Sequence, residues 1–289
     1  MAFTSVREML KAAQEQNMPL WETILEDDLK DRGNSREDSL RQMEALWSAM
    51  KSASSQYSPS ACSKSGLVGG DGEKMARYAR SRDSISGCFL NEIIAEALRM
   101  GESNACMKRI VASPTAGSCG VLPAVLIPCS RACSFSDEEI IHSLYVAAGF
   151  GQVIASRASI SGAEGGCQAE IGAASAMAAA ALTSLKKGTP EMGADACAMA
   201  LMNLLGLVCD PVAGLVEIPC VKRNVIGAMN AVSSAEMALA GITSRIPADE
   251  VIDAMRSVGD LMSPALKETG TGGLAATPFG IAAAERIHR

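Results

Sequence analysis

Aromatic side chains are scarce in this sequence of 289 residues and make up 3% of it. Alanine and glycine are abundant by comparison, with 26 glycines. A core with few large rings must be built mostly from small side chains, which let neighbouring helices approach closely. The hydrophobic share of 48% is nevertheless that of an ordinary globular protein. The composition therefore argues against extensive disorder and favours closely packed helices.

The sequence also lacks a surplus of positive charge. Its 26 Lys and Arg residues are outnumbered by 32 Asp and Glu residues, which gives a net charge of −6. Proteins that bind nucleic acid neutralise its phosphates with a basic face. We therefore expect no nucleic-acid partner and favour a small-molecule ligand.

Long apolar runs are missing as well. The most apolar stretches, residues 173–185 and 196–208, fall short of the roughly 20 residues that cross a bilayer, and we expect both to be buried helices. The N-terminus is amphipathic and charged, without the apolar stretch and small-residue cleavage site of a signal peptide. We therefore expect no membrane partner and a cytoplasmic protein.

Helical signals begin at the N-terminus, where Ser5 and Glu8 have the spacing of a capping box, and Asn34 and Glu37 repeat it. Few stretches alternate with the period of two that is typical of strands. The sequence predicts an all-α fold, with an N-terminal helical segment over residues 1–60 and a helical catalytic domain over residues 61–289. We expect ordinary core packing for the apolar stripe formed by Leu40, Met43, Trp47 and Met50.

Loops rich in glycine and proline separate the expected helices. Each combines glycine with hydroxyl-bearing or acidic residues, and several open into a helix, where free backbone N–H groups can receive a carboxylate. Any one of these loops could instead serve only helix ends and close crossings. Together they favour a small anionic ligand, and they are SPTAGSCG (113–120), SISGAEGGC (159–167), CDPVAGLVEIPC (209–220) and TGTGGLAATPFG (269–280).

Ten cysteines in a cytosolic chain of this size are thiols or metal ligands rather than disulfides. No Cys-x-x-Cys pair is present, so the sequence contains neither a zinc ribbon nor a ferredoxin-type run. Some lie in or beside apolar runs and are expected to be small buried side chains, namely Cys88, Cys106, Cys129, Cys133 and Cys197. Others lie in turned segments where a thiolate can project into a cleft, which leaves them open as metal ligands: Cys119, Cys167, Cys209 and Cys220.

Nearly the whole chain resembles the α chain of the two-chain, iron–sulfur-dependent bacterial L-serine dehydratases. Strings of this length do not recur by chance. The resemblance is carried by SGLVGGDG (65–72), SPTAGSCG (113–120), SISGAEGGCQAEIG (159–172), GLVCDPVAGLVEIPCVKRN (206–224) and GLAATPFG (273–280).

The resemblance implies a [4Fe–4S] cluster held by Cys167, Cys209 and Cys220, and it returns Cys119 to the structural class. An iron with an open position would act as a Lewis acid on the hydroxyl of L-serine, in amino-acid degradation that supplies pyruvate for gluconeogenesis. No cysteine follows Cys220 in the sequence, so we expect no fourth thiolate from its C-terminal end. From resemblance and loop chemistry together, we expect the serine site to be lined by Ser113, Thr115, Gly117, Ser161 and Gly162.

The resemblance also implies an oligomer with a second, β subunit, which carries the histidine usually assigned to catalysis. This chain has only His142 and His288, and His142 lies among apolar residues at helical spacing, as a structural histidine would. The sequence does not name the base that removes the Cα proton. Two other interpretations stay open: a related iron–sulfur lyase acting on L-cysteine or L-threonine, and a non-catalytic helical subunit that only binds its partner.

Overall fold

The computed structural model describes residues 3–81 and 84–287. Within these two ranges the fold contains no β-strand, and an isolated β-bridge joins Cys209 to Lys267, so the all-α prediction is confirmed. The α-helices are α1 (Val6–Gln16), α2 (Leu20–Arg32), α3 (Arg36–Ser55), α4 (Asp71–Ala79), α5 (Gly87–Ala105), α6 (Val121–Cys133), α7 (Asp137–Arg157), α8 (Gly162–Gly165), α9 (Ala173–Leu185), α10 (Pro190–Met202), α11 (Cys220–Leu239), α12 (Ala248–Leu261) and α13 (Pro278–Ile287). The shorter turns are the π-helix η1 (Gln168–Gly172) and the 3₁₀ helices η2 (Val212–Gly214), η3 (Pro264–Leu266) and η4 (Gly273–Ala276).

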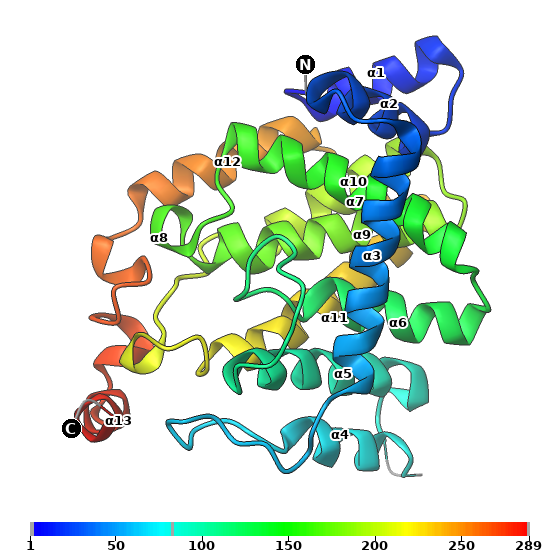
Figure 1. Cartoon of the computed structure of the whole chain (residues 1–289). Helices are drawn as coiled ribbons and strands as arrows, with labels where there is room; N and C mark the ends of the chain where they lie inside the picture. The colour runs from blue at the N-terminus through cyan, green and yellow to red at the C-terminus, as the bar shows by residue number, and fades with distance from the viewer. Residues whose placement is uncertain (1–2, 82–83, 288–289) are drawn as a thin grey trace.

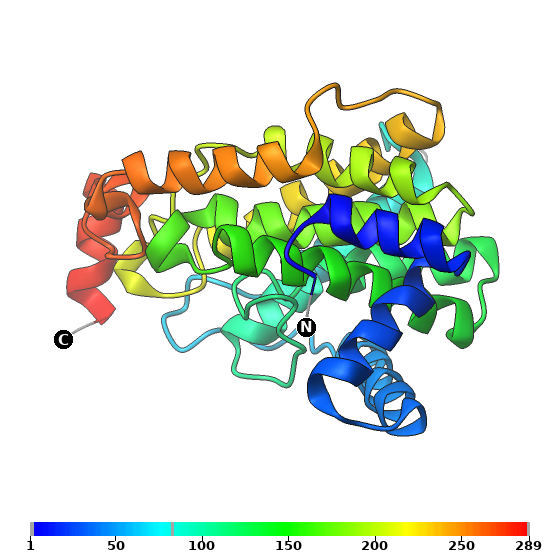
Figure 2. The ribbon, with the colours of Figure 1, turned by 90° about the horizontal axis from the view of Figure 1, so that it is seen from above.

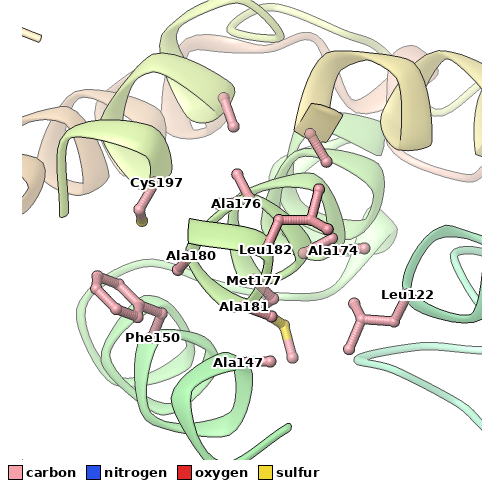
Figure 3. Packing of buried hydrophobic residues seen from close by; sticks show 14 of the residues in the cluster. Leu122, Ala147, Phe150, Ala174, Ala176, Met177, Ala180, Ala181, Leu182 and Cys197 are labelled. Carbon is pink, nitrogen blue, oxygen red and sulfur yellow. The ribbon is translucent and has the colours of Figure 1, made fainter. Parts of the chain in front are cut away.

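Helix α9 lies at the centre of the bundle, where it packs against α6, α7, α10 and α11 (Figure 1). Every residue of α9 except Ser184 is buried, as expected for a helix that is apolar on all sides. Figure 3 shows Phe150 of α7, Cys197 of α10 and Leu122 of α6 around the alanines of this helix. The buried helix predicted over residues 173–185 is confirmed.

Helix α10 is shorter than the sequence predicted, because it ends at Met202 and not at residue 208. Gly206 has a φ of 83°, a left-handed conformation that does not continue an α-helix. Its N–H donates a hydrogen bond to Oε1 of Gln168 at 2.9 Å, and the N–H of Gln168 donates to the carbonyl of Leu207 at 2.9 Å. The six residues after α10 therefore turn back toward η1.

The first predicted helix cap is confirmed in part. The Ser5 hydroxyl accepts a hydrogen bond from the N–H of Glu8 at 3.1 Å, but the Glu8 carboxylate accepts from Thr4 rather than from Ser5. The cap predicted at Asn34 is wrong by one residue. Ser35 has the extended backbone that a cap needs and accepts from the N–H of Asp38 at 3.1 Å.

The apolar stripe of α3 packs into the core as predicted. Trp47 and Met50 are buried there, and Leu40 and Met43 are partly buried against it. Side chains from residues 1–60 and from residues 61–289 contribute to this same core. The division of the chain at residue 60 stays a prediction.

One end of the bundle brings together segments that are far apart in the sequence. Helix α12 packs on α8, while η2 packs on both η4 and α13. Figures 1 and 2 both show the segment that contains η2, coloured yellow, beside the C-terminal segment in red.

Among the helices of residues 3–81 and 84–287, none is long and apolar enough to cross a membrane.

Candidate active site

Three buried cysteines reach this end of the bundle from three segments. Cys167 directly precedes η1, Cys209 lies in the segment between α10 and η2, and Cys220 is the first residue of α11. Their exposed fractions are 3%, 3% and 9%. Within the described residues, all three are free thiols.

The electrostatics show that the three thiols lie near one another. Burial raises the pKa of Cys167 and of Cys220 to about 12 each. Burial also raises the pKa of Cys209, and the negative charges of Cys167, Glu170 and Cys220 add to that rise. Opposing them is Arg223, whose positive charge lowers the pKa of Cys167 and Cys220. Without a further cation these thiols stay protonated.

Glu170 lies in η1 and joins the thiols to a second loop. Its Oε1 accepts a hydrogen bond from the Thr115 hydroxyl at 2.7 Å, across 55 positions of sequence. Burial raises the pKa of Glu170, the hydrogen bond from Thr115 lowers it, and the charge of Glu268 raises it. A partly buried carboxylate therefore stands beside the three thiols.

Two glycines leave room for this carboxylate. A Cβ on Gly162 would lie 2.9 Å from Glu170 Oε2 and 3.0 Å from Cys209 Sγ. A Cβ on Gly117 would lie 3.0 Å from Glu170 Oε1. Any larger residue would displace the carboxylate or the sulfur, so the backbones of α8 and of the 113–120 loop approach Glu170 closely only because both positions are glycine.

The 113–120 loop is held against α11 by Asn224, which is 1% exposed. Asn224 donates to the carbonyls of Gly117 at 2.8 Å and of Cys220 at 3.0 Å, and its Oδ1 accepts from the N–H of Gly120 at 2.8 Å. At the start of the loop, the buried hydroxyl of Ser113 has no hydrogen-bond partner among the described residues. A buried hydroxyl without a partner is available to a ligand.

The predicted serine-site residues are brought together only in part. Thr115, Gly117 and Gly162 surround Glu170 directly. Ser161 caps α8 with its carbonyl, and its own N–H donates to the Ser159 hydroxyl at 3.0 Å. Its neighbour Gly162 lies beside Cys209 Sγ.

A buried ion pair holds the segment between Cys209 and Cys220. Arg223 Nη2 lies 2.8 Å from Asp210 Oδ1, and Arg223 Nη1 donates to the carbonyl of Val208 at 2.7 Å. The other oxygen of Asp210 accepts from the N–H of Leu274 at 2.7 Å. The GLAATPFG motif is thereby fixed to the segment that carries Cys209.

Glu217 makes the corresponding link to the SGLVGGDG motif. This carboxylate is 7% exposed and accepts hydrogen bonds from the hydroxyls of Ser63, at 2.9 Å, and of Ser65. The loop before α4 is therefore attached three residues ahead of Cys220.

Sequence reasoning did not single out Glu170, Asp210, Glu217, Arg223 and Asn224. All five lie inside the motif strings SISGAEGGCQAEIG and GLVCDPVAGLVEIPCVKRN. A charged or amide residue inside an otherwise apolar motif was the sequence signal that could have identified them as site residues.

The remaining seven cysteines differ in burial, and Cys62, in the serine-rich loop before α4, is exposed. Cys119, Cys129 and Cys197 are buried, as predicted. The same prediction is wrong for Cys88 and Cys133, which are exposed because they lie on the solvent side of α5 and at the end of α6, and Cys106 is half-buried. Cys119 lies 3.8 Å from the carbonyl of Met100, and burial raises its pKa to about 12.

His142 packs as a structural residue. Its ring stacks on Trp21 with centroids 3.6 Å apart and an angle of 9° between the planes. His288 lies outside the described residues.

Over the described ranges, no group of three or more His, Cys, Asp or Glu side chains is arranged around a point for a metal ion. The thiols of an iron–sulfur cluster bind different irons and so stand further apart than the ligands of one ion.

A cavity of about 340 Å³ borders the segment before Cys167 and is lined on its charged side by Glu164, Arg256, Asp260 and Lys267.

The fold and the site define an all-α protein in which loops between helices collect three buried thiols around one carboxylate. The family model described as serine dehydratase alpha chain matches residues 15–275. The chain belongs to this family.

Its relatives differ in length. The chain is 48% identical to the probable L-serine dehydratase, alpha chain, of Bacillus subtilis (strain 168), over 96% of this chain and 93% of that protein. It is 42% identical to the L-serine dehydratase, alpha chain, of Peptoniphilus asaccharolyticus, over 96% and 95%. It is 43% identical to L-serine dehydratase TdcG of Escherichia coli (strain K12), over 70% of this chain but 45% of that longer protein.

Proposed function

We propose that this chain is a subunit of an L-serine dehydratase, an ammonia-lyase that converts L-serine to pyruvate and ammonia. The observation that carries the proposal is the group of three buried thiols beside Glu170 in a member of the serine dehydratase alpha chain family. The printed names of the relatives agree with it.

In this proposal Cys167, Cys209 and Cys220 hold a [4Fe–4S] cluster. The donor chemistry fits, because all three are sulfur ligands, are shielded from solvent and are free of disulfides within the described residues. Their raised pKa values also fit, since a bound cation stabilises the thiolate form that burial disfavours. When bound, the cluster supplies a Lewis acid for the hydroxyl that leaves from serine.

The residues of this chain position the substrate. We assign the serine carboxylate to the hydroxyls and backbone N–H groups of the two loops that carry Ser113, Thr115, Gly117, Ser161 and Gly162. The unpartnered hydroxyl of Ser113 supports this assignment. We place the base that removes the Cα proton on a second chain, because His142 is engaged with Trp21.

The partner in this proposal is a separate β chain, in a cytoplasmic oligomer that degrades serine and supplies pyruvate for gluconeogenesis. Relatives named alpha chain match this chain over nearly their whole length. L-serine dehydratase TdcG and L-serine dehydratase 1 of Escherichia coli are matched over 45% of their length, so they contain residues that this chain does not.

Anaerobic reconstitution with iron and sulfide, alone and with the β chain, tests the proposal. We expect pyruvate from L-serine only when both chains are present. Release of sulfide from L-cysteine, or of 2-oxobutyrate from L-threonine, at a higher rate would reassign the substrate. A chain that took up no iron under these conditions would be a non-catalytic partner.

Three single variants test the ligands. We expect Cys167→Ser, Cys209→Ser and Cys220→Ser each to lose most of the bound iron and the broad visible absorbance. Cys119→Ala is the matched control, since it removes an equally buried thiol that lies outside the site. Loss of iron from the control alone would contradict the assignment.

A further inference from the structure

Glu170 has one anchored oxygen and one that is open. Oε1 accepts the hydrogen bond from Thr115 at 2.7 Å, which fixes the orientation of the carboxylate. Oε2 makes no hydrogen bond to any residue that the structure describes. The open oxygen is the one that faces Gly162 and Cys209, on the side of the thiols.

The backbone of Gly162 packs directly against Oε2. A single methyl group on Gly162 would be 2.9 Å from Oε2 and 3.0 Å from Cys209 Sγ. A side chain at position 162 would therefore displace the carboxylate or one of the proposed cluster ligands. Glycine at this position lets Glu170 Oε2 and Cys209 Sγ lie on the same side of α8.

Glu170 also has no cation of its own. Among residues 3–81 and 84–287, no lysine, arginine or histidine forms an ion pair with it. The guanidinium of Arg223, whose charge acts on Cys167 and Cys220, is engaged by Asp210 at 2.8 Å. Glu268 adds negative charge to the surroundings. A partly buried carboxylate without a positive partner is unusual, because buried charges are normally paired.

We propose that Glu170 binds the α-ammonium group of the amino-acid substrate through Oε2. This inference rests on the proposed function. It assigns the ammonium group and the carboxylate of the substrate to different parts of the site. The ammonium group faces Glu170, and the carboxylate is kept away from it by like-charge repulsion. The Cα–H is then held between the two contacts, with the hydroxyl directed toward the thiols.

The competing explanation is structural: Glu170 could do no more than anchor Thr115. The two explanations differ for a ligand that lacks the amino group. 3-Hydroxypropionate has the carboxylate and hydroxyl of serine but no ammonium group, so it cannot gain from a carboxylate partner. Loss of an anchor weakens both ligands, whereas loss of an ammonium-binding group weakens only serine.

The test uses the reconstituted complex with the β chain and the variant Glu170→Gln, which keeps the shape of the side chain and removes its charge. We expect the KM for L-serine to rise about 10- to 100-fold, as for loss of a charge-assisted hydrogen bond. The inhibition constant of 3-hydroxypropionate should change less than about threefold, since its contacts are retained. Glu191→Gln is the matched control, because Glu191 is an exposed carboxylate in the first turn of α10 and belongs to neither of the two substrate loops.

Iron content and the visible spectrum are recorded for every variant before the kinetics. If Glu170→Gln lost the cluster, Glu170→Asp would replace it, with a smaller rise in KM expected from the shorter reach of a retained charge. Equal weakening of both ligands, or an unchanged KM for serine, would overturn the inference while leaving the proposed function intact. If the wild-type complex released no pyruvate, the proposed function would fail, and calorimetric titration of unreacted serine and of 3-hydroxypropionate would still decide the role of Glu170.

Discussion

Arg223 and Asp210 form a buried ion pair with 2.8 Å between Nη2 and Oδ1, and their side chains are 11% and 4% exposed. The pair connects the first turn of α11 to the residue after Cys209. Through Leu274, Asp210 also reaches the C-terminal segment. The carboxylate of Asp210 therefore holds three segments together: α11, the segment that contains Cys209, and the C-terminal segment.

Breaking this pair should destabilise the protein strongly. Asp210→Asn leaves the guanidinium of Arg223 buried without a counter-charge, which costs about 3–5 kcal/mol. Urea denaturation of the cluster-free chain measures the loss. The control is Asp253→Asn, which removes the nearer of the two carboxylates that pair with Arg157, at a site where the Asp253 side chain is 54% exposed, and it should cost under about 1 kcal/mol. Equal losses in the two variants would contradict the expected importance of burial.

Removal of the Glu217 carboxylate should release the loop between α3 and α4. In Glu217→Ala the hydroxyls of Ser63 and Ser65 lose their acceptor, at a local cost of about 1–3 kcal/mol. Limited proteolysis followed by mass spectrometry should show faster cleavage within residues 56–70. Glu236→Ala, an exposed change on α11, should leave the cleavage pattern as it is. A loop that stayed resistant in Glu217→Ala would show that other contacts hold it.

His142 should make the protein less stable as the pH falls. Burial lowers the pKa of His142 below its ordinary value of 6.5, so the unfolded chain takes up the proton first as acid is added. Stability that comes from the neutral ring is therefore present above pH 6.5 and is lost as the pH falls through that value. The charged groups that act on the ring are Glu138, Glu22, Arg36 and Glu139.

The variant His142→Phe tests this dependence, because it keeps an aromatic ring against Trp21 and cannot titrate. Free energies of unfolding at about pH 7.5 and 5.5, on either side of the ordinary histidine pKa, should differ less in the variant than in the wild type. If the free energy of unfolding changed equally with pH in both proteins, the pH dependence would come from groups other than His142.

Enlarging a core alanine should strain the bundle. Ala180 of α9 is fully buried, and Figure 3 shows it on the side that faces Phe150 and Cys197. Ala180→Leu adds volume where helices already touch, and we expect a loss of about 1–3 kcal/mol in thermal or urea unfolding. Ala282→Leu on the exposed side of α13 should change stability by less than about 0.5 kcal/mol. An unaffected Ala180→Leu would reveal a void beside α9.

Local sequence patterns predicted the helices well where the signal lay within one or two turns. The bounds of α9 and the apolar stripe of α3 follow from the spacing of apolar residues alone. Sequence patterns gave wrong helix ends where contacts with another segment, or the backbone angles of a turn, determine the end. The end of α10 depends on hydrogen bonds with Gln168, and the choice of Ser35 over Asn34 depends on backbone angles at the turn. Apolar neighbours in sequence likewise did not make Cys88 and Cys133 buried.

The sequence by itself determined the helical fold, the family and the three candidate thiols, because these are properties of spacing and of motif strings within short stretches. Only the tertiary structure decided which groups meet. Thr115 and Glu170 are 55 positions apart, and Ser65 and Glu217 are 152 apart. Such contacts form only after helices pack and loops close, and no periodicity in the chain reports them. For that reason the carboxylate beside the thiols became visible in the folded protein and not in the sequence.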